Sequence, residues 1–290
     1  MTPESLVGET QDLFSLPDVV RRINQLIDAP DTRSADLAEV IRFDPGLSAR
    51  LLRVVNSALY ARPQPIETVT QAINLIGHQA LRDLVMATCM VDLFKGLPPD
   101  WIDMDRFWFQ AVACGIGAGD IASRAGLSQS ERLFMTGLLH SLGRLIFVTQ
   151  CPNDYLDVLR LIEQESLESS VAEQRVFGFD YTRLSAELLK AWGFPESIWM
   201  AIAQVSMPAQ ATQYRVESEI LHVAILIADR LMLNHVGGTV PTVDRLAEES
   251  QALAEYLSLD PEALDELPDA IALQVMDVFG ILMPEASLIF

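Results

Sequence analysis

Apolar residues recur at intervals of three and four along almost the whole chain, and this spacing limits the fold more than any other feature of the sequence. It gives each segment one apolar face of the kind that an α-helix buries. No stretch alternates apolar and polar residues between turn signals, as a half-buried strand would. Half of the 290 residues are hydrophobic, which is enough for a large core. The sequence therefore predicts an all-α protein.

Capping and breaking residues predict where several helices begin and end. Asp44-Pro45 combines a side-chain cap with proline at the first helical position. Gly77 is expected to end the helix that follows Thr68. A single helix is expected from Ser130 to Phe147. Ser170 and Glu173 have the spacing of a capping box, which predicts a short helix ending near Gly178.

Proline and glycine cluster between Lys95 and Asp103, and the Gly237-Gly238 pair interrupts a later helical pattern. These breaks divide the chain into an N-terminal helical subdomain (1–94), a second helical subdomain (95–235) and an acidic C-terminal helical extension (236–290). The expected linker is the 95–103 segment.

Charge and hydropathy exclude some classes of partner. With 40 acidic and 20 basic residues, the net charge of -20 disfavours direct binding to nucleic acid. No apolar run reaches the ~20 residues that span a bilayer, and the polar N-terminus lacks the features of a secretory signal, so we expect no membrane insertion. Cys89, Cys114 and Cys151 are far apart and lie among apolar residues, which favours buried thiols in the reducing cytoplasm.

Gly115, Gly117 and Gly119 superficially match a phosphate-binding loop. Such a loop needs a preceding strand and a helix N-terminus, whereas these glycines lie inside a helical pattern. Close packing of two helices is the better explanation.

The segment from Leu138 to Gly143, with sequence Leu-Leu-His-Ser-Leu-Gly, resembles the metal-binding segment of HD phosphohydrolases. Taken alone, His140 on an apolar helix is more often a hydrogen-bonded core histidine than a metal ligand. The wider set of motifs, from about Leu13 to Asp229, resembles the HDOD family. In chain order these motifs are Leu16-Pro17, Asp44-Pro45-Gly46-Leu47, Leu51-Leu52-Arg53, Asn56-Ser57-Ala58-Leu59-Tyr60, Ala72-Ile73 with Gly77, Phe107-Trp108, Phe177-Gly178, and Trp192 with Pro195.

The resemblance implies an N-terminal helical bundle packed on an HD-phosphohydrolase-like helical domain, used in bacterial signal transduction as an output or scaffold module. Asp44 is expected to cap a helix, and Asn56 to end it by bonding to the following loop. The other family positions expected to be structural are Pro45, Ser57, Tyr60, Gly77, Trp108, Gly178 and Trp192.

The resemblance also shows how far the metal ligands have been lost. An HD hydrolase needs several histidines and aspartates to hold its metals. The first expected histidine falls near Gln110, and the His-Asp pair becomes His140-Ser141. Tyr181 replaces a third histidine, while Asp229 alone can match the last acidic ligand. A final pair of histidines is replaced by Val205 and Ser206.

The sequence therefore predicts a non-catalytic signalling module that holds no metal or other cofactor and works by docking a protein partner through an apolar helical surface. Self-association stays open. The alternative is a ligand-sensing module whose degenerate pocket, around His140, Tyr181 and Asp229, holds a nucleotide second messenger or another anion. Residual phosphohydrolase activity ranks third.

Overall fold

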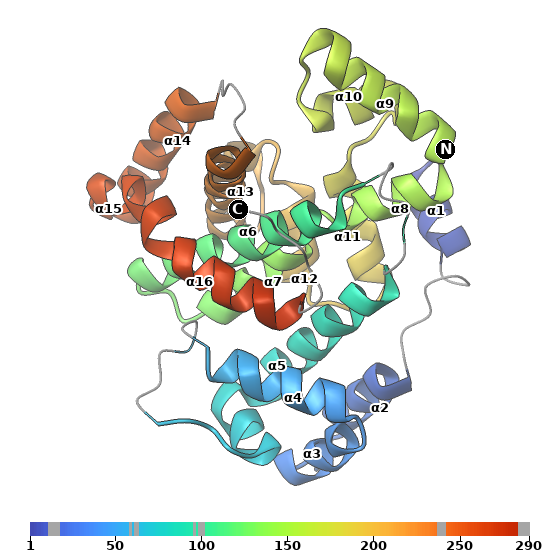
Figure 1. Cartoon of the computed structure of the whole chain (residues 1–290), viewed down its shortest axis with the longest axis vertical. Coiled ribbons are helices and arrows are strands. Elements are labelled where there is room, and N and C mark those ends of the chain that lie inside the picture. Colours follow the sequence, from blue (N-terminus) through green and yellow to red (C-terminus); the bar gives the residue numbers. More distant parts are fainter. Residues whose placement is uncertain are drawn as a thin grey trace. The chain divides into compact units, whose positions relative to one another are not determined.

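The computed structural model describes residues 1–10, 18–57, 60, 64–94, 97, 102–236 and 242–283. All regular elements of these residues are helices, which confirms the all-α prediction (Figure 1). None of the described helices is long and apolar enough to cross a membrane. The predicted linker is largely outside the described residues, as are Leu13, the Leu16-Pro17 motif and the Gly237-Gly238 pair.

The chain forms two compact units, one of Met1–Ser15 with Gly96–Asp269 and one of Leu16–Lys95 with Ala270–Phe290. Both units contain segments from distant parts of the sequence. The first 15 residues therefore belong with the larger unit, and residues 236–269 do so as well. The ranges predicted from the sequence place these segments instead in the N-terminal subdomain and in a separate extension.

The smaller unit contains α2 (Asp18–Ile27), α3 (Ser34–Arg42), α4 (Pro45–Val55) and α5 (Val69–Leu93), followed much later by most of α16 (Leu267–Leu282). The predicted start of α4 is confirmed, because the Asp44 carboxylate accepts a hydrogen bond from the Leu47 amide at 2.9 Å. The break at Gly77 is also present, where α5 leaves helical geometry at a φ of 80°.

Asn56 ties the end of α4 to the following loop, as predicted. Its side-chain amide donates to the carbonyls of Leu52 and Ile66, both at 2.8 Å, and its side-chain oxygen accepts from the Ile66 amide at 2.7 Å. Ser57 donates to the Val54 carbonyl at 2.7 Å. These bonds satisfy carbonyl groups that the end of the helix leaves open.

The larger unit contains the remaining helices. They are α1 (Pro3–Thr10), α6 (Met104–Arg124), α7 (Ser130–Leu139), α8 (Leu142–Gln150), α9 (Pro152–Glu165), α10 (Ser169–Phe177), α11 (Tyr181–Ala191), α12 (Glu196–Ala203), the 3-10 turn η1 (Pro208–Gln210), α13 (Arg215–Val236), α14 (Thr242–Leu257) and α15 (Pro261–Asp265). Helix α6 packs against both α7 and α13. Gly178 ends α10 with a φ of 81°, and the buried Trp192 follows α11.

Glycines allow α6 and α7 to lie unusually close, as their helical context predicted. A Cβ on Gly115 would lie 2.8 Å from the Phe134 carbonyl oxygen, and one on Gly137 would lie 2.7 Å from backbone atoms of Cys114. All three cysteines are buried. The glycine pattern therefore belongs to helix packing rather than to a phosphate-binding loop.

The expected single helix from Ser130 to Phe147 is wrong, because it breaks at His140 and Ser141 into α7 and α8. The break directs α8 onto α11, and a Cβ on Gly143 would lie 2.3 Å from the Tyr181 carbonyl oxygen. The Gly143 amide also donates to the Ser185 hydroxyl at 2.7 Å. The contact between these helices therefore requires glycine at this position.

We expect Gly143→Ala to lower the free energy of unfolding by about 1–3 kcal/mol or more, because the two nearest neighbours of the new methyl group are backbone atoms that cannot turn away. Gly8→Ala in α1 is the matched control, since a Cβ at this position would have no atom within 4 Å. That variant should be unchanged or more stable by up to ~1 kcal/mol. Urea unfolding of both variants makes the comparison, and equal stabilities would contradict the close contact.

Candidate functional site

Five of the seven positions that correspond to HD metal ligands line one cavity in the larger unit. Gln110 comes from α6, Tyr181 from the start of α11, and Asp229 from α13, while Val205 and Ser206 follow α12. The cavity has a volume of about 880 Å³. The structure therefore gathers residues that are up to 119 positions apart in the sequence.

His140 and Ser141 do not line this cavity, although they correspond to the central metal-binding pair. Both are buried in the turn between α7 and α8. The His140 Nδ1 atom lies 2.6 Å from the Gly137 carbonyl oxygen, and burial lowers the pKa of His140 to about 4. The Nε2 atom of His140 and the Ser141 hydroxyl have no hydrogen-bond partner among the described residues. His140 is thus a neutral core histidine.

Asp229 is engaged by Gln110, whose side-chain amide donates a hydrogen bond to the Asp229 carboxylate. Burial raises the pKa of Asp229, against the opposing effects of Arg144 and of the Gln110 bond. Gln110 stands where the first metal-binding histidine is expected, and it therefore bonds to Asp229, which matches the last acidic ligand. A carboxylate held in this way has less capacity to bind a cation.

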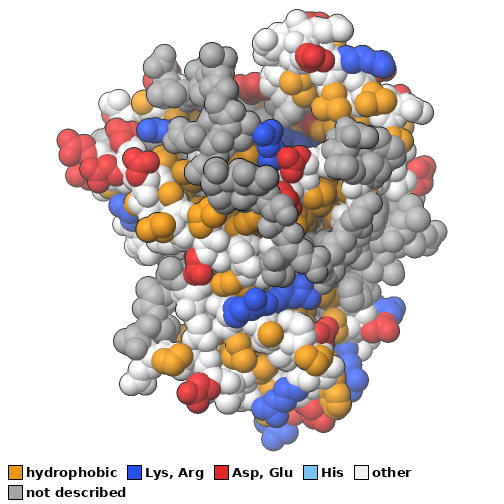
Figure 2. Space-filling model, viewed as in Figure 1, with side chains coloured by type: hydrophobic (Ala, Val, Ile, Leu, Met, Phe, Trp, Pro, Cys, Tyr) orange, Lys and Arg blue, Asp and Glu red, His pale blue; other side chains and the backbone are white. Residues whose placement is uncertain are grey.

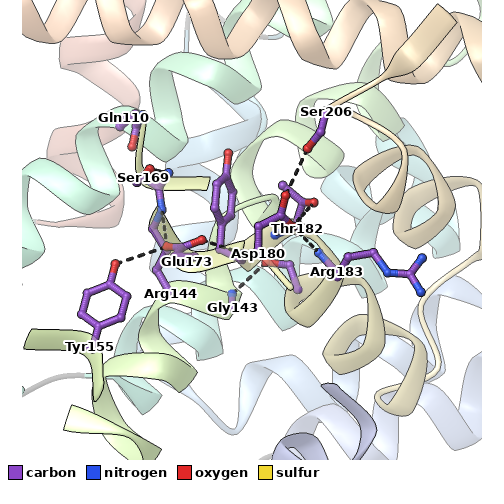
Figure 3. Close-up of polar contacts among 12 residues, drawn as sticks. Gln110, Gly143, Arg144, Tyr155, Ser169, Glu173, Asp180, Thr182, Arg183 and Ser206 are labelled. Carbon is purple, nitrogen blue, oxygen red and sulfur yellow. Dashed lines mark hydrogen bonds and ion pairs between the residues drawn. The ribbon is translucent and has the colours of Figure 1, made fainter. Parts of the chain in front are cut away.

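Asp180 and Ser206 are also bonded within the protein (Figure 3). Asp180 caps α11 by accepting hydrogen bonds from the backbone amides of Thr182 and Arg183 at 3.0 and 3.2 Å. The Thr182 hydroxyl donates to the same carboxylate at 2.6 Å, and the Ser206 hydroxyl does so at 3.2 Å. The Asp180 carboxylate is thus occupied by four donors.

A buried ion pair lies behind the cavity, between Glu173 of α10 and Arg144 of α8. Glu173 has no solvent exposure, and its carboxylate lies 3.7 Å from the Arg144 Nε atom. The Tyr181 amide donates to Glu173 at 2.7 Å, and the Tyr155 hydroxyl lies 3.4 Å away. The predicted capping box is therefore wrong. Ser169 opens α10, no side chain caps it, and Glu173 bonds to the start of α11 instead.

The Arg144 guanidinium joins three elements (Figure 3). Its Nη2 atom donates to the Ser169 hydroxyl at 2.7 Å, and its Cζ atom lies 3.9 Å from the centre of the Tyr181 ring. Burial raises the pKa of Glu173 to about 7, while the positive charge of Arg144 opposes that rise. Arg144 consequently forms one wall of the cavity and also neutralises the buried carboxylate behind it.

Several residues that line the cavity were not identified from the sequence. They come from α8, from both ends of α10, and from α13 and α14, and no local motif links them. Their roles depend on tertiary structure, which a single sequence does not reveal. They are Arg144, Glu168, Ser169, Arg175, His222 and Arg245.

These residues do not fit a catalytic metal centre. The part of the chain that the structure describes contains no group of three or more histidine, cysteine, aspartate or glutamate side chains able to hold a metal ion. Asp229 is bonded to Gln110, and His140 lies outside the cavity lining. A metal with useful affinity needs about four protein ligands in a fixed arrangement.

Comparison with known proteins identifies a family model and several similar structures. The HDOD domain model matches residues 13–208. An uncharacterized protein of Treponema pallidum is 23% identical over 195 residues, which are 67% of this chain and 37% of that protein. The chain thus spans little more than a third of the curated relative that it matches.

Three solved structures cover nearly the whole chain. A candidate phosphohydrolase from Shewanella amazonensis is 24% identical, with a TM-score of 0.74 over 96% of this chain and 97% of that chain. An HDOD domain protein of unknown function from Geobacter sulfurreducens is 22% identical, with a TM-score of 0.72 over 96% of this chain and 97% of that chain. A candidate signal transduction protein from Marinobacter aquaeolei is 26% identical, with a TM-score of 0.69 over 94% of this chain and 60% of that chain.

The burial of neutral His140 predicts a pH dependence of stability. Its pKa is about 4 in the folded chain and about 6.5 in the unfolded chain. The unfolded chain therefore binds more protons between these values, and the stability from neutral His140 is lost as the pH falls from 6.5 towards 4. Between pH 7 and pH 5 the loss should be about 2 kcal/mol.

Urea unfolding at these two pH values, with His140→Gln as the comparison, checks this prediction. The cavity or strain that the substitution introduces is independent of pH, so it cancels in the difference between the two conditions. The wild-type chain should lose more stability on acidification than the variant. An equal loss in both would mean that His140 titrates normally in the folded protein.

Proposed function

Because the chain belongs to the HDOD family, we propose that it is a non-catalytic signal-transduction module that acts by binding a protein partner. The name of the Marinobacter relative, which is 26% identical, supports a role in signalling. Three buried cysteine thiols support a reducing compartment, and we propose the bacterial cytoplasm.

This proposal is based mainly on one observation: side chains at positions that correspond to metal ligands form hydrogen bonds with other side chains of the protein. Gln110 bonds to Asp229, and Ser206 bonds to Asp180, so these side chains satisfy one another. His140 is buried outside the cavity lining. Side chains that already serve as each other's partners stabilise the fold and offer little to a metal or to a reacting water.

The corner between α3 and α4 is the surface that best fits a docking role. Phe43 is 80% exposed there, although large aromatic side chains are normally buried. Arg42 precedes it, and the Arg50 guanidinium points back towards Gly46 at the start of α4. Arg53, one turn further along α4, donates to the Ala49 carbonyl. Figure 2 shows Lys and Arg side chains (blue) beside hydrophobic ones (orange) in the region of α2 to α5.

Neither Arg42 nor Arg53 forms an ion pair with a carboxylate among the described residues, although the chain as a whole is strongly acidic. An exposed aromatic side chain on a corner whose helices also carry arginines resembles the anchor of a protein interface. The chemistry of this corner favours a partner with an apolar socket bordered by carboxylates.

Ser141→Asp tests the non-catalytic part of the proposal, because it restores the aspartate of the His-Asp pair. We expect no stoichiometric manganese, iron or zinc and no phosphodiesterase activity, since the other expected imidazoles are still missing. The new buried carboxylate should also lower stability. Metal analysis after dialysis, with Ser141→Asn as the uncharged control, makes the measurement. One equivalent of metal in the aspartate variant alone would contradict the proposal.

Phe43→Ser and Arg53→Glu test the docking surface. Because both side chains are exposed, each variant should keep the wild-type free energy of unfolding within about 0.5 kcal/mol. Each should nevertheless reduce capture of the native partner about tenfold, as expected for an interface anchor. Leu273→Ser is the matched control, since Leu273 is 84% exposed on α16 and lies outside this corner. Undiminished capture by both corner variants would rule out this surface.

A further inference from the structure

The cavity in the larger unit has the size of a small-molecule site. Its volume of about 880 Å³ falls in the range of about 300–1,000 Å³ that is usual for ligand pockets. Its wall combines α6, α8, α10, α11, α13 and α14. Helix α14 lies beyond the 13–208 segment that the family model matches, so the C-terminal part of the chain completes the cavity.

The lining of the cavity holds three arginines beside three carboxylates, those of Glu168, Asp180 and Asp229. Arg144, Arg175 and Arg245 all line the cavity, whereas the whole chain has only 20 basic residues against 40 acidic ones. Arg144 is 18% exposed and forms the inner wall, while Arg175 and Arg245 are 50% and 40% exposed. Arginine presents planar sets of N–H donors that match phosphate oxygens.

Hydrogen-bond donors exceed free acceptors on this wall. A guanidinium has five N–H donors, yet each of these arginines makes a single hydrogen bond to a described residue. Arg144 bonds to Ser169, Arg175 to Glu165, and Arg245 to Glu168. Each guanidinium is also ion-paired, Arg144 with Glu173, Arg175 with Glu165 and Arg245 with Glu168. Most of its five N–H donors nevertheless make no hydrogen bond to a described residue.

The carboxylates of the cavity are already bonded. Asp229 accepts from Gln110, Asp180 accepts from its four donors, and Glu168 pairs with Arg245. The Tyr181 hydroxyl adds a further donor, because the hydrogen bond that Tyr181 donates to Glu173 uses its backbone N–H. A ligand rich in acceptor oxygens complements such a wall, and a ligand rich in donors does not.

We infer that this cavity binds a phosphorylated small molecule, held through its phosphate oxygens by Arg144, Arg245 and the Tyr181 hydroxyl without a metal ion. The ion pair between Arg245 and Glu168 joins α14 to the residue that precedes α10. A bound phosphate competes with Glu168 for Arg245. Binding at this site is independent of the docking surface at Phe43, so either can fail without the other.

Isothermal titration of the full chain with inorganic pyrophosphate, at constant ionic strength and with EDTA present, tests the inference. Saturable binding with one site per chain is the expected result. Because the protein carries a net charge of -20, nonspecific attraction of an anion is disfavoured. No saturable binding of pyrophosphate would overturn the inference.

Three variants locate the site. Tyr181→Phe should raise the dissociation constant about 3- to 10-fold, the effect of one hydroxyl donor. Arg245→Gln should raise it about tenfold or more, because a charge-assisted contact is lost. Glu168→Gln should lower it several-fold, since the competing carboxylate is removed. This gain of affinity cannot result from a loss of folding.

Arg160→Gln is the control, because Arg160 pairs with Asp157 on α9 and does not line the cavity. Its dissociation constant should equal that of the wild-type chain. An effect of Arg160→Gln as large as that of Arg245→Gln would mean that pyrophosphate binds through general surface charge. Unchanged affinity in Tyr181→Phe, Arg245→Gln and Glu168→Gln together would likewise overturn the inference.

Discussion

The buried pair of Glu173 and Arg144 is the interaction on which the centre of the larger unit depends. Glu173 is fully buried, and it bonds to the Tyr181 amide at the start of α11. Arg144 compensates its charge, bonds to Ser169 at the start of α10 and stacks on the Tyr181 ring. One ion pair thus fixes the mutual positions of α8, α10 and α11, which form much of the cavity wall. Loss of either partner would leave an uncompensated buried charge.

Features encoded locally could be predicted from the sequence. The all-α fold followed from apolar spacing, the start of α4 from Asp44-Pro45, and the close packing of α6 and α7 from glycines inside a helical pattern. The role of Asn56 followed from its place at the end of a helix. In each case the residues that decide the structure lie close together in the chain or carry a distinctive backbone preference.

Features that depend on distant contacts could not be predicted. The helical pattern continues through His140 and Ser141, yet the chain breaks there because α8 packs against α11. Glu173 has the spacing of a capping box, but its carboxylate accepts a hydrogen bond from the backbone amide of Tyr181 instead. The arginines of the cavity are scattered over three helices, so their convergence is invisible in the sequence.

We propose that the HDOD core of this chain needs no metal, because Gln110 bonds to Asp229, Ser206 bonds to Asp180, and His140 is buried outside the cavity lining. Metal analysis of the wild-type chain, purified without chelators from cells supplied with manganese, iron and zinc, tests this most directly when combined with thermal unfolding before and after EDTA. We expect metal well below one equivalent per chain and the same Tm in both conditions. One tightly held equivalent whose removal lowers the Tm would contradict it.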